Sequence, residues 1–172
     1  MEIKIKKLRE DAILPLKKTD GAIGYDLSVP ADICIDRPRQ VIPLGFAIEL
    51  PEYIEAKIEA RSGFSSKGIE AFALEYDKAN YKTGEQLWCR IDKSERFNAD
   101  VLTGKIDPDY RGEVGVIIRN NENDPFRPFL IKKGTRSAQM TFYNTFPVDD
   151  FEIVDELSET ERGDGGFGHT GI

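Results

Sequence analysis

The chain has 172 residues, which fits one domain over residues 1–172, and its formal net charge is −7 from 31 acidic and 24 basic residues. This acidic balance argues against a surface that holds the phosphate backbone of DNA or RNA, so we expect no nucleic-acid partner. No stretch approaches the ~18 apolar residues that cross a bilayer, and the first ten residues lack the apolar run of a secretory leader, so we expect a soluble, cytoplasmic protein with no membrane partner.

Several short segments alternate apolar with polar residues, and others are short apolar runs bounded by turn residues. Both patterns are typical of β-strands. The strands expected from them cover residues 3–5, 33–35, 41–50, 54–60, 69–74, 114–118, 129–131 and 139–143. No segment of ten or more residues has a 3.6-residue period. The sequence therefore predicts an all-β fold of the sandwich, barrel or jelly-roll type.

Two segments depart from this pattern. Residues 76–100 are polar, and we expect them to be irregular. After Phe151 the chain becomes acidic and then ends in GDGGFGHTGI, with five glycines from Gly163 to Gly171. Because such a tail cannot pack a core, we expect a flexible C-terminal arm over about residues 158–172.

Glycine and small polar residues stand beside a single arginine in three places. These are Arg61-Ser62-Gly63, Gly134-Thr135-Arg136 followed by Gln139, and Arg162-Gly163. Phosphate oxygens are bound by guanidinium forks and by backbone N–H groups that no Cβ obstructs. Each segment is a candidate phosphate site, with a surface turn as the alternative.

Two further segments carry acids at turns. In GKIDPDYRGEVGV, Pro108 fixes φ and Asp107 occupies the position that starts a tight turn. In DGAIGYDLSVP, Asp26 follows Gly24 at the start of a strand. The alternatives are a structural Asx turn for the first segment and a solvated carboxylate for the second.

Together and in this order, the five segments resemble the five motifs of the trimeric dUTPase family. The matching segments are GAIGYDL, RSGFSSKGI, TGKIDPDYRGEVGV, KGTRSAQM and RGDGGFGHTG, which extend over nearly the whole chain. The resemblance implies a jelly-roll subunit and a homotrimer with shared active sites. It also implies hydrolysis of dUTP to dUMP and pyrophosphate, which keeps uracil out of DNA and supplies dUMP for dTMP synthesis.

The resemblance further implies the residue roles. Asp107 would orient and deprotonate the attacking water, while Mg²⁺ would bridge the three phosphates, with Asp26 holding one of its waters. Tyr110 would exclude a 2′-hydroxyl, and Phe167 would stack on uracil, with core packing as the alternative for both rings. The residues implied to bind substrate are Arg61, Ser62, Gly63, Gly104, Ile106, Tyr110, Arg136, Gln139, Arg162, Phe167, Gly168, His169 and Thr170.

The chain departs from the family pattern at four places. His169 stands where Ser is usual, Ala60 where Pro often precedes the arginine, and Val101 where Asn is often found. The fourth departure is an insertion over about residues 70–102. It is either a surface hairpin or a docking surface for a protein partner, for which Tyr76, Tyr81, Trp88 and Phe97 would form an aromatic patch.

Two other functions compete with this reading. A dCTP deaminase of the same fold would need a catalytic glutamate where this chain has Ile117. A nucleotide-sensing regulatory protein would act through the insertion at 70–102. The presence of Asp107, which serves mainly turnover, counts against a purely non-catalytic role.

Overall fold

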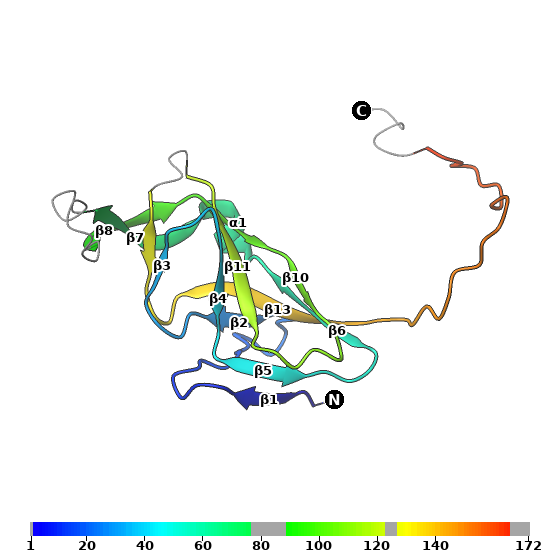
Figure 1. Ribbon diagram of the computed structural model, residues 1–172, viewed down its shortest axis with the longest axis horizontal. Coiled ribbons are helices and arrows are strands. Elements are labelled where there is room, and N and C mark those ends of the chain that lie inside the picture. The colour runs from blue at the N-terminus through cyan, green and yellow to red at the C-terminus, as the bar shows by residue number, and fades with distance from the viewer. Residues whose placement is uncertain (1, 77–88, 123–126, 166–172) are drawn as a thin grey trace, which may run out of the picture.

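The computed structural model describes residues 2–76, 89–122 and 127–165 (Figure 1). These residues form thirteen strands and one short helix, which confirms the all-β class. The elements in chain order are β1 Lys4–Lys7, β2 Tyr25–Ser28, β3 Ile33–Ile35, β4 Arg39–Pro43, β5 Phe46–Glu49, β6 Ile54–Glu59, α1 Ser62–Lys67, β7 Ile69–Tyr76, β8 Cys89–Phe97, β9 Ala99–Leu102, β10 Gly104–Ile106, β11 Gly115–Asn120, β12 Phe129–Ile131 and β13 Arg136–Asn144.

The strands pair antiparallel in four small sheets around one core. Their orders are β1-β5, β10-β6-β13-β2, β4-β11-β9 and β3-β12-β7-β8. In β6, Ile54, Ala56 and Ile58 are buried while the residues between them are half-buried, as the two-residue period requires. At the centre the Phe97 and Phe129 rings stack with centroids 4.7 Å apart. Burying each such side chain stabilises the fold by ~1.5–3 kcal/mol.

Two expectations about local structure are wrong, and one short helix had no signal in the sequence. The run at 41–50 is not one strand, because Gly45 adopts φ +78° and separates β4 from β5. Residues 62–67 form a helix that is too short to show a period in sequence. Residues 89–100, expected to be irregular, belong largely to β8 and the start of β9, whose many charged residues hide the strand pattern.

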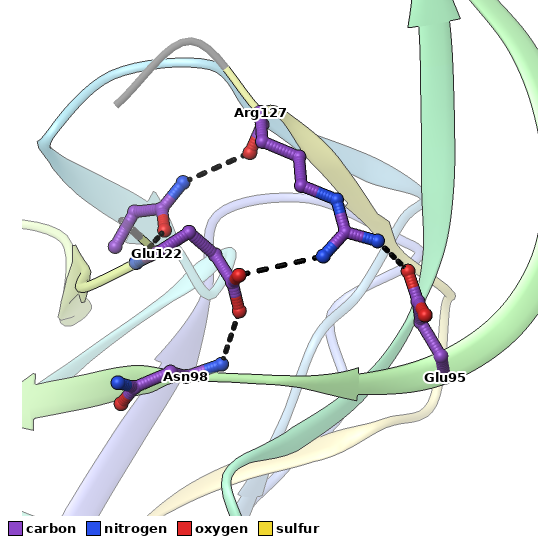
Figure 2. Close-up of polar contacts among 5 residues, drawn as sticks. Glu95, Asn98, Glu122 and Arg127 are labelled. Atoms are coloured by element: carbon purple, nitrogen blue, oxygen red, sulfur yellow. Dashed lines mark hydrogen bonds and ion pairs between the residues drawn. The ribbon is translucent and has the colours of Figure 1, made fainter. Parts of the chain in front are cut away.

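The predicted insertion contains the β7–β8 hairpin, and its base is fixed to the rest of the domain (Figure 2). The guanidinium of Arg127 binds both Glu95 on β8 and Glu122, and it lies 4.9 Å from the centre of the Phe97 ring. The Asn98 N–H donates to Glu122 Oε1 at 2.6 Å. The hairpin therefore leaves the body from a rigid base.

Phe97 does not join the predicted aromatic patch. It is 1% exposed and belongs to the core, because it packs inward against Phe129. Tyr81 and Trp88 lie outside the described residues, as does the side chain of Tyr76. Protein docking at residues 70–102 stays a prediction.

After β13 the chain leaves the body as an extended arm over residues 145–165 (Figure 1). The arm exposes large apolar side chains, among them Phe146, Phe151 and Ile153, the last 98% exposed. So many large apolar side chains exposed close together in sequence are unusual unless another surface covers them. Within the described part of the chain, no helix has the length and apolar character needed to span a membrane.

Candidate active site

A carboxylate held between two arginines forms the centre of the site. Arg61 Nε donates to Asp26 Oδ1 at 2.8 Å, and Arg136 Nη1 donates to Asp26 Oδ2 at 3.0 Å. The Asp26 side chain is only 13% exposed, so solvent screens these two contacts less than it would on an open surface. One carboxylate thus fixes two guanidinium groups, leaving the cluster with an excess positive charge.

Neighbouring strands bring these residues together. β13 lies between β6 and β2, so Arg61 just after β6 and Arg136 at the start of β13 both reach Asp26 on β2. Gln139 is paired with Asp26 on one side and with Glu59 on the other. Sheet pairing therefore joins predicted motifs that lie more than a hundred residues apart in sequence.

Gln139 is held next to the cluster by close packing. Its Nε2 lies 3.4 Å from the Ala60 carbonyl oxygen, which makes a long hydrogen bond. A Cβ atom at Gly24 would lie 2.8 Å from Gln139 Oε1, so a residue larger than glycine would displace the amide. Close packing against Gln139 therefore explains why residue 24 is a glycine, which its position before Asp26 in the sequence did not reveal.

The turn that precedes Arg136 is also fixed. Gly134 adopts φ +83°, which favours glycine, and its N–H donates to the Val29 carbonyl at 2.7 Å. Asp32 accepts hydrogen bonds from the Lys132 ammonium and from the Lys133 N–H, the latter at 2.8 Å. These two bonds lower the pKa of Asp32 below its ordinary value.

Ser62 and Gly63 open helix α1 immediately after Arg61. A Cβ atom at Gly63 would meet nothing within 4 Å, so none of the described neighbours requires a glycine there. Open space at that position leaves the backbone accessible to a bound group. Arg61, Gly63, Thr135 and Arg136 line one side of an open pocket of about 350 Å³.

Asp107 starts the predicted turn. The Tyr110 N–H donates to the Asp107 carbonyl at 3.1 Å, which is the bond that closes a β-turn. The Tyr110 side chain is 45% exposed, so core packing does not account for it. Gly104 and Ile106 precede the turn in β10, where Ile106 is buried and Gly104 has open space around its Cβ position.

Two neighbours that the sequence did not single out orient the Tyr110 ring. Its hydroxyl donates to the Glu113 carbonyl at 3.1 Å, and the Glu113 carboxylate accepts from the Gly45 N–H at 2.7 Å. A Cβ atom at Gly112 would lie 2.3 Å from the Tyr110 hydroxyl oxygen, so only glycine permits this ring position. The sequence YRGE marks this turn, but the contacts that Gly112 and Glu113 make with Tyr110 become evident only in the folded structure.

The Asp107 turn and the arginine cluster do not meet within one chain. Ile106 pairs with Ala56, and the antiparallel register sends Asp107 away from the end of β6 that carries Arg61. Arg61 is five residues beyond Ala56, which corresponds to ~16 Å at ~3.3 Å per residue. Within one copy of the chain, the Asp107 turn and the arginine cluster are therefore separate.

The predicted site also includes residues near the C-terminus. Arg162 belongs to the arm of residues 145–165, and its Nε donates to the Gly165 carbonyl at 2.7 Å. Phe167, Gly168, His169 and Thr170 lie outside the described residues, so their implied roles stay predictions.

Side chains alone do not build a metal cage in the described ranges. No group of three or more His, Cys, Asp or Glu residues comes together there. A Mg²⁺ ion that keeps several waters and takes its other oxygen ligands from substrate phosphates needs no such cage. The single carboxylate of Asp26, with both oxygens already accepting from arginines, suits an indirect contact through water.

Comparison with known proteins gives the family. The dUTPase family model matches residues 10–77 and 93–171, and the unmatched residues 78–92 fall within the predicted insertion. The chain belongs to the dUTPase family. This confirms the resemblance found in the five motifs.

Curated members of the dUTPase family align with almost the whole chain. A deoxyuridine 5'-triphosphate nucleotidohydrolase of Hydrogenobaculum sp. is 40% identical and covers 100% of this chain and 99% of its own. The protein of the same name from Paramecium bursaria Chlorella virus 1 is 33% identical and covers 98% of this chain and 96% of its own. Among solved structures, Staphylococcus bacteriophage 80alpha dUTPase with dUPNHPP has a TM-score of 0.75 at 23% identity, with 99% of each chain covered.

Proposed function

We propose that the chain hydrolyses dUTP to dUMP and pyrophosphate. The relatives that align over nearly its full length are named for this activity. The observation that carries the proposal is the pair of arginines fixed by Asp26 beside the open start of α1. Two fixed guanidinium forks and accessible backbone N–H groups suit a chain of phosphates.

In this proposal Arg61, Ser62 and Gly63 hold the α- and β-phosphates. Arg136 and the Gln139 amide complete the grip from β13. Because these groups are placed before the substrate binds, the charge that develops during the reaction meets dipoles and cations that need not reorganise. Arg162 and Thr170 are proposed to hold the γ-phosphate when the arm closes, with Phe167 stacked on uracil and Gly168 and His169 beside it.

Asp107 is proposed to act on the attacking water. Its carboxylate orients the water and accepts a proton as the oxygen bonds to the α-phosphorus. The bond from the α-phosphorus to the bridging oxygen breaks, and pyrophosphate leaves with that oxygen. Tyr110 packs against the sugar where a 2′-hydroxyl would collide, and the backbone from Gly104 through Ile106 reads uracil.

Mg²⁺ is the proposed cofactor, and Asp26 would hold it through water. When bound, the ion would supply neutralisation of phosphate charge, which lowers the cost of bringing a nucleophile to phosphorus. A phage phi11 dUTPase of similar fold, with a TM-score of 0.67, is described with a structural Mg(II) ion.

We also propose that the active unit is a homotrimer whose sites are shared between copies. The distance between the Asp107 turn and the arginine cluster supports this, because a second copy is needed to bring them together. The arm supports it too, since its exposed apolar residues need a surface to cover them. An open apolar pocket of about 330 Å³ offers such a surface, lined by Ile3, Ile5, Leu14, Pro15, Tyr25, Ile48, Met140 and Phe142.

The reaction is tested by offering dUTP, dCTP, dTTP and UTP with Mg²⁺ and measuring pyrophosphate and ammonia. We expect pyrophosphate from dUTP alone, and Asp107→Asn should abolish its release while sparing nucleotide binding. Asp109→Asn is the matched control, because it removes the same charge from the same turn. Ammonia from dCTP would instead show the deaminase reaction.

Shared sites are tested by mixing two inactive variants, Asp107→Asn and Arg61→Gln. If each site takes Asp107 and Arg61 from different copies, random mixed trimers regain about one quarter of wild-type activity, because one site in four receives both native residues. Sites contained in single chains would regain none.

A further inference from the structure

The pocket beside the arginine cluster includes residues outside the five family motifs. Besides Lys67 and Gly68 of the RSGFSSKGI segment, it is lined by Glu70 and Arg96, which belong to no motif. With Asp26, the pocket combines four cations, Arg61, Lys67, Arg96 and Arg136, with two carboxylates. Its net charge is therefore positive, although the chain as a whole carries −7. Such a local reversal of sign indicates a site for an anion.

Arg96 comes from β8, within the predicted insertion, yet it is tied to the phosphate-binding segment. Its Nη1 donates to the Gly68 carbonyl at 3.2 Å, and Gly68 caps the end of α1, the helix that starts with Ser62. Gly68 adopts φ +69°, and a Cβ atom there would lie 2.2 Å from the Phe97 carbonyl oxygen. The residue that ends helix α1 thus packs directly against the backbone at the end of β8.

The direction of the Arg96 side chain follows from the strand. Successive side chains of a strand point to opposite faces, so Glu95 and Phe97 share one face and Arg96 takes the other. Arg127 binds Glu95 (Figure 2) and also lies 4.9 Å from the centre of the Phe97 ring, so both residues face Arg127. Arg96 is therefore directed away from that contact, into the pocket that it lines with Arg61.

Arg96 also keeps its charge available. Its ion pair with Glu70 is long, at 3.6 Å, and both side chains are more than half exposed. An exposed ion pair of this length contributes little to stability, so a phosphate group can replace Glu70 at small cost. Arg61 and Arg136, in contrast, are both held by Asp26.

We propose that Arg96 is a further substrate-binding residue, which holds the outer phosphates of the nucleotide and of released pyrophosphate. The inference rests on the proposed function, because it assigns Arg96 to the outer end of the phosphate chain that Arg61 is proposed to bind. The inserted hairpin then contributes a cation to the site as well as support for α1.

The test compares Arg96→Gln with Arg96→Lys and with Arg37→Gln. Arg37 is the matched control, because it too is an exposed arginine with one long ion pair, to Asp36 at 3.8 Å, and it does not line the pocket. Binding of pyrophosphate and of dUMP is measured by calorimetry, so the result does not depend on turnover. Steady-state hydrolysis then gives KM and kcat.

We expect Arg96→Gln to weaken pyrophosphate binding and raise KM for dUTP by about tenfold, with dUMP binding and kcat within twofold of wild type. Arg96→Lys should recover part of the loss, and Arg37→Gln should show none. The assignment would be refuted if Arg96→Gln and Arg37→Gln bound pyrophosphate equally well. It would also be refuted if Arg96→Gln lost as much dUMP binding as pyrophosphate binding, because that result would indicate a structural role. A wild-type chain that releases no pyrophosphate from dUTP would instead refute the proposed function.

Discussion

Asp26→Asn keeps the shape of the side chain that holds Arg61 and Arg136 but removes its charge. An amide offers one acceptor oxygen, and its NH₂ group would face the donor of the other guanidinium. At least one of the contacts at 2.8 and 3.0 Å is therefore lost, and the second weakens. A hydrogen bond to a charged group contributes ~1.5–3 kcal/mol. Because both arginines are partly exposed, we take the lower end, ~1.5–2 kcal/mol, which corresponds to a ~10- to 30-fold fall in kcat.

The assay is steady-state release of pyrophosphate from dUTP at increasing Mg²⁺. KM should stay within about threefold, because the lost negative charge strengthens the attraction for phosphate while the arginines lose their orientation. Asp100→Asn is the control, since Asp100 also accepts from two donors, Arg119 and Asn121, but on β9. If saturating Mg²⁺ restored kcat of Asp26→Asn, Asp26 would act by holding a water of the ion, and its role in orienting the arginines would be refuted.

Three other changes have defined outcomes. Gly112→Ala should raise kcat/KM for UTP relative to that for dUTP at least tenfold, because the Cβ of the new alanine must displace Tyr110. An unchanged ratio of the two kcat/KM values in competition assays would contradict this. Gly68→Ala should lower the free energy of unfolding, measured in urea, by ~2 kcal/mol or more, because the backbone at residue 68 has φ +69° and leaves no room for a Cβ. A loss below ~0.5 kcal/mol would show that the end of the helix relaxes around the new Cβ. Hydrogen bonds from Asn121 and Arg119 lower the pKa of Asp100 below its ordinary 3.8, so its stabilisation is complete above about pH 4 and is lost as pH falls. Asp100→Asn should therefore lose less stability than wild type between about pH 5 and pH 2, and parallel acid-unfolding curves would exclude this contribution.

The parts of the fold that sequence predicted are those in which burial follows a simple period. Alternate burial in β6 places Ile54, Ala56 and Ile58 inside, as their spacing indicated. The pattern failed where one backbone angle decides the path, as at Gly45, which breaks a long apolar run into two strands. It failed again in β8, where five charged residues outnumber the apolar ones and hide the strand pattern.

For the site, motif order predicted the participants but not their contacts. Nothing local to Asp26 says that Arg61 and Arg136 will both bind it, since that contact depends on the strand order β6-β13-β2. Gly112 and Glu113 could be located only once the turn had folded, because their effect on Tyr110 is a matter of atomic distance. Spatial neighbours outside any motif, such as Arg96, have no sequence signal at all.

The register between β10 and β6 has a further consequence for activity. It places the proposed water-activating carboxylate of Asp107 and the phosphate-binding Arg61 at opposite ends of one strand pair. Side-chain movement of a few ångströms cannot close a gap of ~16 Å, whereas a second copy can present its Asp107 turn without any change in fold. Activity should then require the assembly of several copies as well as the folding of each chain. A change that separates the copies would abolish turnover in chains whose own Asp26, Arg61 and Arg136 contacts are intact.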